Sequence, residues 1–135
     1  MDRLLHTPIV TALLASSTVK AMLDTYTIGS TTYYPVIYGR SIPAEFQDMN
    51  RLIQIYRVTS IGASQLNEVT YTVNCRQATE PLSEQLAEIV YGVLNRIFAT
   101  YDSTTTYMRC NVGSSIMETE TDWNCPVDVQ ISTEL

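Results

Sequence analysis

One block of the sequence, residues 51–98, constrains the fold more than any other. It contains two alternating strands, a turn between them and a long amphipathic helix, with no linker. Successive side chains of a strand point to opposite faces, so alternation separates an apolar face from a polar one. In the second strand, residues 67–77, the apolar set is Val69, Tyr71, Val73 and Cys75. The block therefore predicts helices packed on one face of an antiparallel sheet.

The first strand of the block, residues 51–61, is partly apolar on both faces. Ile53 and Ile55 lie on one face, while Leu52 and Tyr56 lie on the other. A strand of this kind makes contacts on both sides, so we expect it inside the sheet. Residues 62–65 read as the hairpin loop that follows it.

The main helix of the block begins near Thr79, with Pro81 in its first turn. Its apolar residues recur at helical spacing and form a stripe wide enough to cover a sheet. The stripe is Leu82, Leu86, Ile89, Val90, Val93, Leu94 and Ile97. Gly92 lies near this stripe, and we expect it to permit close packing.

The remaining elements flank this block. Thr7 and Pro8 start an N-terminal helix, residues 16–18 interrupt it, and a short second helix follows. Residues 31–38 read as a strand that Pro35 confines to an edge or a bulge. The segments predicted as connections are 25–30, 39–50 and 113–122, and the last two strands are predicted at 104–112 and 123–131.

These elements predict a single α+β domain over residues 1–135. The expected architecture is a two-layer sandwich in the order α-β-β-β-α-β-β. Its sheet has four to five mainly antiparallel strands, and two helices cover one face.

The charge and cysteine content of the chain exclude some classes of function. The net charge is −6, and Lys20 is the only lysine, so the chain lacks the cationic surface that nucleic-acid binding requires. We expect no membrane span and no signal peptide, and therefore assembly in the cytoplasm. The three cysteines, Cys75, Cys110 and Cys125, form no Cys-x-x-Cys pair, and we expect buried free thiols.

Residues suited to catalysis are few. His6 is the only histidine, and we expect it to be solvated ahead of the first helix. Glu118, Glu120 and Asp122 form the only acidic cluster, which could meet a cation or could form a solvated hairpin tip. We assign no catalytic, cofactor-binding or metal-binding residue and expect a protein that is not an enzyme. The nine tyrosines suit an interface, because tyrosine pairs a large apolar body with a polar tip.

The order of elements and their local sequences resemble the tail-terminator, or tail-completion, proteins of long-tailed bacteriophages. The resemblance covers most of the chain, from the first helix through the main helix. The segments that carry it are residues 33–39 (YYPVIYG), 42–44 (IPA), 52–58 (LIQIYRV), 71–75 (YTVNC), 80–90 (EPLSEQLAEIV) and 93–96 (VLNR). Residues 101–135 fit the family less distinctively.

The resemblance implies a homohexameric ring in the virion, at the head-proximal end of the tail. Such a ring caps the tail tube, ends its polymerisation and presents a joining surface to the head-completion or connector protein. DNA passes through its lumen only as cargo. The expected interface residues are Gln54, Thr70, Thr72 and Asn74 on the polar sheet face, with Arg57 and Arg76 facing acids of a neighbour. The alternatives are a head-completion or neck protein, and a small metal-dependent cytoplasmic enzyme that uses the acidic cluster.

Overall fold

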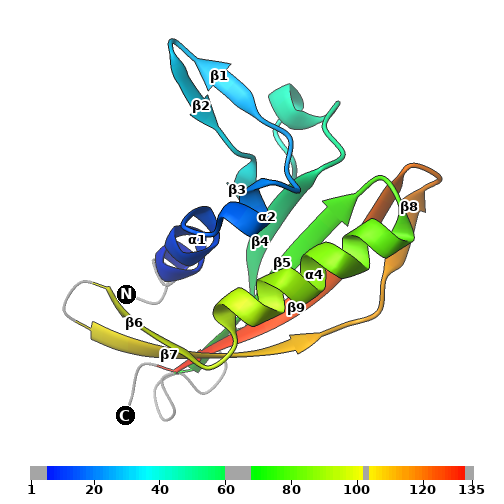
Figure 1. The fold of residues 1–135 in the computed structure, drawn as a ribbon. Coiled ribbons are helices and arrows are strands. Elements are labelled where there is room, and N and C mark those ends of the chain that lie inside the picture. The colour runs from blue at the N-terminus through cyan, green and yellow to red at the C-terminus, as the bar shows by residue number, and fades with distance from the viewer. Residues whose placement is uncertain (1–5, 60–67, 102–103, 133–135) are drawn as a thin grey trace.

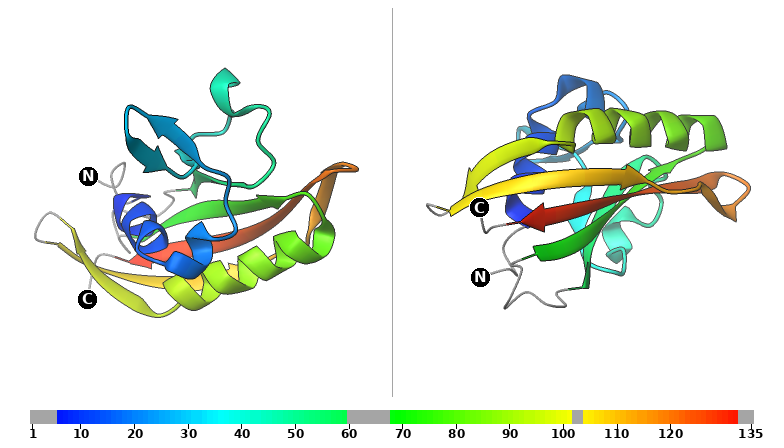
Figure 2. Two further views of the ribbon diagram at one scale, coloured as in Figure 1. Left: turned by 45° about the horizontal axis from the view of Figure 1, so that its top comes forward. Right: turned by 90° about the horizontal axis from the view of Figure 1, so that it is seen from below.

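The computed structural model describes residues 6–59, 68–101 and 104–132. It is an α+β fold in which helices lie against one face of a curled sheet (Figures 1 and 2). The helices are α1 (His6–Leu14), α2 (Ser17–Lys20) and α4 (Glu80–Leu94), with a 3-10 turn η2 at Ala44–Phe46. The strands are β1 (Tyr26–Ile28), β2 (Thr31–Tyr33), β3 (Val36–Tyr38), β4 (Leu52–Thr59), β5 (Glu68–Gln77), β6 (Ile97–Tyr101), β7 (Thr104–Val112), β8 (Ile116–Thr119) and β9 (Asp122–Ser132).

The main sheet has the strand order β3-β4-β5-β9-β7-β6, and β8 pairs with the end of β9 beyond β7. All pairs are antiparallel except β3 with β4, which is parallel. The predicted α+β class is confirmed, but the described residues form three α-helices where the two-layer prediction has two. The predicted number of strands is wrong, because the main sheet has seven strands and β1-β2 form a separate two-stranded sheet.

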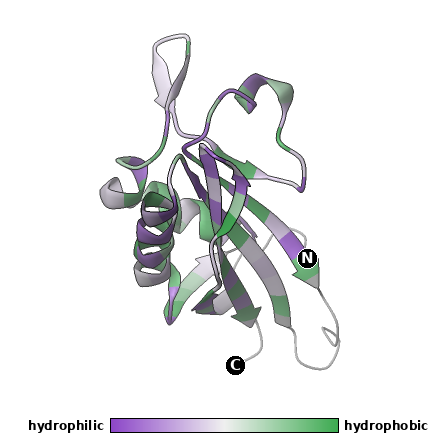
Figure 3. Ribbon diagram, turned by 90° about the vertical axis from the view of Figure 1, so that its right-hand side faces the viewer, coloured by the Kyte–Doolittle hydropathy of each residue, from purple (hydrophilic) through white to green (hydrophobic). Residues whose placement is uncertain are grey.

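The core lies between the helices and the helix-facing side of the sheet. The predicted apolar face of β5 is fully buried there, and β9 contributes Cys125, Val127, Val129 and Ile131. Helix α4 adds Leu86, Ala87, Val90 and Leu94. Figure 3 shows the polar and apolar colours alternating along the strands. Each large apolar side chain buried here stabilises the fold by about 1.5–3 kcal/mol before conformational entropy is subtracted.

Helix α4 begins as predicted and ends earlier than predicted. Thr79 is its N-cap, and its hydroxyl accepts a hydrogen bond from the Leu82 amide at 3.4 Å. The predicted stripe continues to Ile97, but the helix ends at Leu94. Arg96 has φ 61°, a left-handed conformation that turns the chain into β6. Ile97 therefore belongs to a strand that the helical spacing concealed.

Gly92 does not permit close packing, which corrects the sequence prediction. It is exposed on α4, and a Cβ at this position would meet nothing within 4 Å. Gly92→Ala should therefore raise the free energy of unfolding by about 0.5–1 kcal/mol, because alanine restricts the unfolded chain and favours helix. Thermal denaturation measures the change. Gly113→Ala is the matched control, and it should destabilise, since its Cβ would lie 3.0 Å from Cγ of Pro126.

The N-terminal helix, the break and the short second helix are confirmed. Ser16 caps α2 by accepting a hydrogen bond from the Val19 amide at 3.2 Å. The expectation that His6 is solvated is wrong. His6 is the first residue of α1, is half-buried, and stacks on the Tyr38 ring with 4.0 Å between ring centroids.

The predicted strand at 31–38 is divided at Pro35 into β2 and β3, and β3 is an edge strand as expected. The predicted connection at 25–30 contains β1, which forms a hairpin with β2 around Gly29. Gly29 has φ 65°, which suits glycine in a tight turn. We call this hairpin, residues 25–34, the arm, since it projects from the body of the fold (Figure 1).

The remaining sequence predictions concern the turn at 113–122 and the hairpin loop at 62–65. The expected turn at 113–122 contains β8, a short strand whose residues are all exposed. The expected hairpin loop at 62–65 lies outside the described residues. Among the described helices, none is long and apolar enough to cross a membrane.

Candidate subunit interface

A recess lies on the sheet face opposite α1, α2 and α4. Its floor is formed by three amide side chains, Gln54, Asn74 and Asn124. We call it the amide recess. Gln54 is opposite Asn74 in the register of β4 and β5, and Asn124 is opposite Arg76 in the register of β5 and β9. Paired residues share a face, so these side chains all project into the same space. Its volume is about 550 Å³.

The amides are buried on the sheet face opposite α1, α2 and α4, where Gln54 also lines a pocket with Phe46 of η2. Gln54 is 4% exposed, and Asn74 and Asn124 are each 7% exposed. The walls of the recess include Arg40, from the segment that follows β3, and Ile116, from β8. Buried amides are therefore concentrated where a globular domain usually presents solvated polar residues.

Two of the amides have internal partners, and the third has an orphan atom. Gln54 Nε2 donates to the Gly39 carbonyl at 2.8 Å, and Asn74 Nδ2 donates to the Tyr56 hydroxyl at 3.4 Å. Asn124 Oδ1 is buried and has no hydrogen-bond partner among the described residues. A buried acceptor without a donor is uncommon, because its desolvation is uncompensated.

Several charged side chains around the recess are held within the chain. Arg76 forms an ion pair with Asp122. Asp128 accepts a hydrogen bond from the Thr72 hydroxyl at 2.9 Å. The Arg40 guanidinium lies 4.5 Å from the centroid of the Tyr56 ring. The three amides of the floor are uncharged, but Arg40, Arg76, Glu118 and Asp128 also line the recess. The recess therefore offers hydrogen-bonding groups to a polar ligand between charged walls.

Four of the six predicted interface residues come together in this recess: Gln54, Thr72, Asn74 and Arg76. Thr70 lines a different pocket, and Arg57 is exposed near the end of β4, where its carbonyl accepts a hydrogen bond from Arg40. The expectation that a neighbour supplies the acid for Arg76 needs correction. Asp122 of the same chain occupies that role, and both side chains are about one-fifth exposed.

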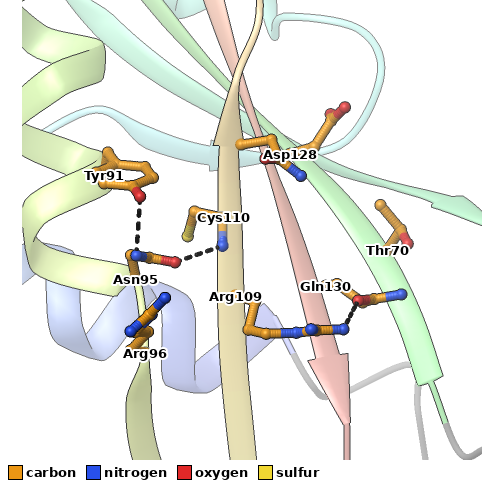
Figure 4. A pocket seen from close by; sticks show the side chains of 9 residues that line it. Thr70, Tyr91, Asn95, Arg96, Arg109, Cys110, Asp128 and Gln130 are labelled. Carbon is orange, nitrogen blue, oxygen red and sulfur yellow. Dashed lines mark hydrogen bonds between the residues drawn. The ribbon is translucent and has the colours of Figure 1, made fainter.

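The pocket that contains Thr70 lies at the end of α4 (Figure 4). Asn95 organises it, since its Nδ2 donates to the Tyr91 hydroxyl at 3.0 Å and its Oδ1 accepts from the Cys110 amide at 2.9 Å. Arg109 donates to Gln130 at 2.7 Å. These bonds join the helix end to β7, so we interpret the pocket as structural.

The acidic cluster is only partly assembled. Asp122 pairs with Arg76, Glu118 lines the amide recess, and Glu120 lies in the turn between β8 and β9. Within the described residues, no group of three or more His, Cys, Asp or Glu side chains is placed to hold a metal ion.

Sequence reasoning missed Asn124, Asp128 and Ile116. The strict alternation of β9 contained the signal, since Asn124 and Asp128 lie between its apolar residues. The polar half of that alternation places Asn124 and Asp128 on the same sheet face as Arg76 and Thr72. Ile116 was missed because β8 was predicted as a turn.

Exposed apolar side chains gather at two opposite edges of the main sheet. The arm and the adjoining strand β3 carry Ile28, Tyr33 and Tyr38, which are 64%, 42% and 45% exposed. The far edge, formed by β6, β7 and β8, carries Phe98, Val112, Ile116 and Met117, which are 64%, 37%, 51% and 56% exposed. The two edges differ in their residues and in the strands that form them.

Neither a protein-family model nor a curated protein sequence matches this chain.

Proposed function

We propose that this protein is a virion assembly subunit that forms a ring on the head-proximal end of a phage tail tube. The observation that carries the proposal is the pair of unlike apolar edges on opposite sides of the sheet. A closed ring requires head-to-tail contacts, in which one patch of each subunit fits a different patch of the next. Burying both edges would remove exposed apolar surface that a monomer would leave in water.

The resemblance to tail-terminator proteins gives the ring its proposed task. A hexameric ring on the tube end stops tube polymerisation and offers its outer side to the connector of the head. The partners are then other copies of this chain, the tail tube protein and a head-completion protein. The net charge of −6 is compatible with a lumen through which DNA passes without binding.

The decisive experiment for this role uses virions that lack the protein. Negative-stain images should show overlong tails without heads, because no ring ends tube growth. Filled heads without tails would instead identify a neck or head-completion protein. Virions of normal length that remain infectious would refute both roles.

A substitution in the far edge tests ring formation separately. Ile116→Glu should reduce the hexamer to monomer, because a carboxylate would be transferred from water into the subunit contact. Size-exclusion chromatography with light scattering measures the change across a concentration series. Val58→Glu makes a similar change at a residue that is 49% exposed and outside both edges, and it should leave the ring intact. Equal behaviour of the two variants would refute the assignment of this edge.

A further inference from the structure

We propose that the arm of one subunit binds in the amide recess of the next, with Ile28 against Ile116. This inference rests on the proposed ring and specifies its contact. It concerns two parts of the molecule. The arm is a hairpin that pairs with no other described strand, and the amide recess contains a buried acceptor without a described partner.

The arm lacks the support that a hairpin needs. Among the described strands, β1 and β2 pair only with each other, and two-stranded hairpins alone are marginally stable in water. Most arm side chains are exposed. Within the same chain, the aromatic rings of Tyr26 and Phe46 lie 5.1 Å apart between centroids, and this contact joins the arm to η2. Another surface is needed to bury the apolar tip at Ile28.

The chemistry of the arm fits the recess. Residues 25–34 include no charged side chain, but they carry several hydroxyl groups and the exposed backbone of two strands. The recess has an amide floor, an apolar part formed by Ile116 and Pro126, and charged side chains in its walls that the hydroxyl and backbone groups of the arm can contact by hydrogen bonds. Asn124 Oδ1 is fully buried and has no partner among the described residues, so an arm amide or hydroxyl would donate to it once the Asn124 side chain rotates toward the recess.

The spacing of the amides suits an extended polypeptide. Asn74 and Asn124 are diagonal neighbours on β5 and β9, because Asn74 is opposite Pro126. Diagonal positions in an antiparallel sheet are about 7–8 Å apart. Peptide groups on one side of an extended chain recur about every 6.8 Å. Two peptide groups on the same side of an arm strand, two residues apart, therefore match the spacing of the two amides.

The positions also suit a head-to-tail contact. The arm precedes β3 at one edge of the sheet, whereas β8 and Ile116 lie on the far side of β9. The residues that line the recess include none from the arm of the same chain. Docking between copies therefore joins unlike surfaces, as a closing ring requires.

A cross-linking experiment tests the contact. A photoreactive amino acid replaces Ile28, and subunits labelled with ¹⁴N and ¹⁵N are mixed at ring-forming concentration before irradiation. Mass spectrometry should find mixed-isotope links from position 28 to residues 116–126. Links within one chain, or links between chains to other segments, would overturn the proposal. The same probe at the exposed residue Gln85 is the control, and it should not reach the recess.

Asn124→Ala separates binding from folding. Removing the orphan oxygen should leave the melting temperature of the monomer unchanged or higher, while each subunit contact weakens roughly fivefold or more. A ring that assembles normally in this variant overturns the arm contact and leaves the ring proposal standing. A wild-type protein that stays monomeric at all concentrations and on tube ends overturns both.

Discussion

Arg76→Glu should destabilise the folded subunit by about 2–4 kcal/mol. Arg76 lies on β5 and Asp122 at the start of β9, and they form an ion pair whose side chains are 19% and 21% exposed. The Arg76 Nε atom also lies 3.4 Å from Asp122 Oδ1, so the guanidinium bonds the carboxylate through two nitrogens. The substitution would place two carboxylates together in a largely buried site, where repulsion and desolvation add. Urea denaturation of the monomer measures the loss.

A charge exchange distinguishes this pair from a contact between subunits. The double variant Arg76→Glu/Asp122→Arg should recover at least half of the lost stability, since the opposite charges meet again within one chain. If Arg76 served a neighbour instead, the single variant would unfold at the wild-type urea concentration and only assembly would fail. That outcome would contradict the internal ion pair.

The fold was predictable where local pattern and tertiary structure agree. The alternation of β5, β7 and β9 gave these strands almost their observed bounds, and Thr79 with Pro81 located the start of α4. The end of α4 was not predictable in the same way. Helical spacing continues to Ile97, but Asn95 binds the backbone of Cys110, fifteen positions away, and the chain turns into β6. Nothing local in the sequence signals that bond.

The candidate interface was predictable to a similar extent. Gln54, Thr72 and Asn74 were predicted because two adjacent strands alternate clearly, and the register of β4 with β5 does bring them together. Asn124 and the partner of Arg76 depend on β9, whose register with β5 no short-range pattern determines. The arm was missed because three-residue strands are too short to show alternation.

The three thiols are a second internal feature with a large expected effect. The cysteines are free and buried, and Cys75 is opposite Cys125 in the register of β5 and β9. Burial raises the pKa of Cys110 from 9.0 to about 12. Burial, followed by the charge of Cys125, raises the pKa of Cys75 well above its usual value. Burial also raises the pKa of Cys125, with smaller contributions from Glu84 and Glu88.

These shifts predict that the folded state loses stability at alkaline pH. Below pH 9 the thiols are protonated in both states, so their contribution to stability is complete. As the pH rises above 9, the unfolded thiols ionise while the buried ones do not, and stability falls until the folded pKa is reached. Each strongly shifted thiol should lower the free energy of unfolding by about 1.4 kcal/mol at pH 10. Cys75 and Cys110 together should therefore remove about 2–3 kcal/mol.

The contribution of one thiol can be isolated by comparing variants. Cys110→Val keeps an apolar side chain of similar size, and its free energy of unfolding should fall by about 1.4 kcal/mol less than that of wild type between pH 8 and pH 10. Tyrosine ionisation affects both proteins equally, so it cancels in the difference. Cys75→Ser provides the contrast, since its hydroxyl would destabilise the core by about 1–3 kcal/mol already at pH 8. Parallel pH profiles for wild type and Cys110→Val would show that this thiol titrates in the folded state as it does in water, and that it is not buried.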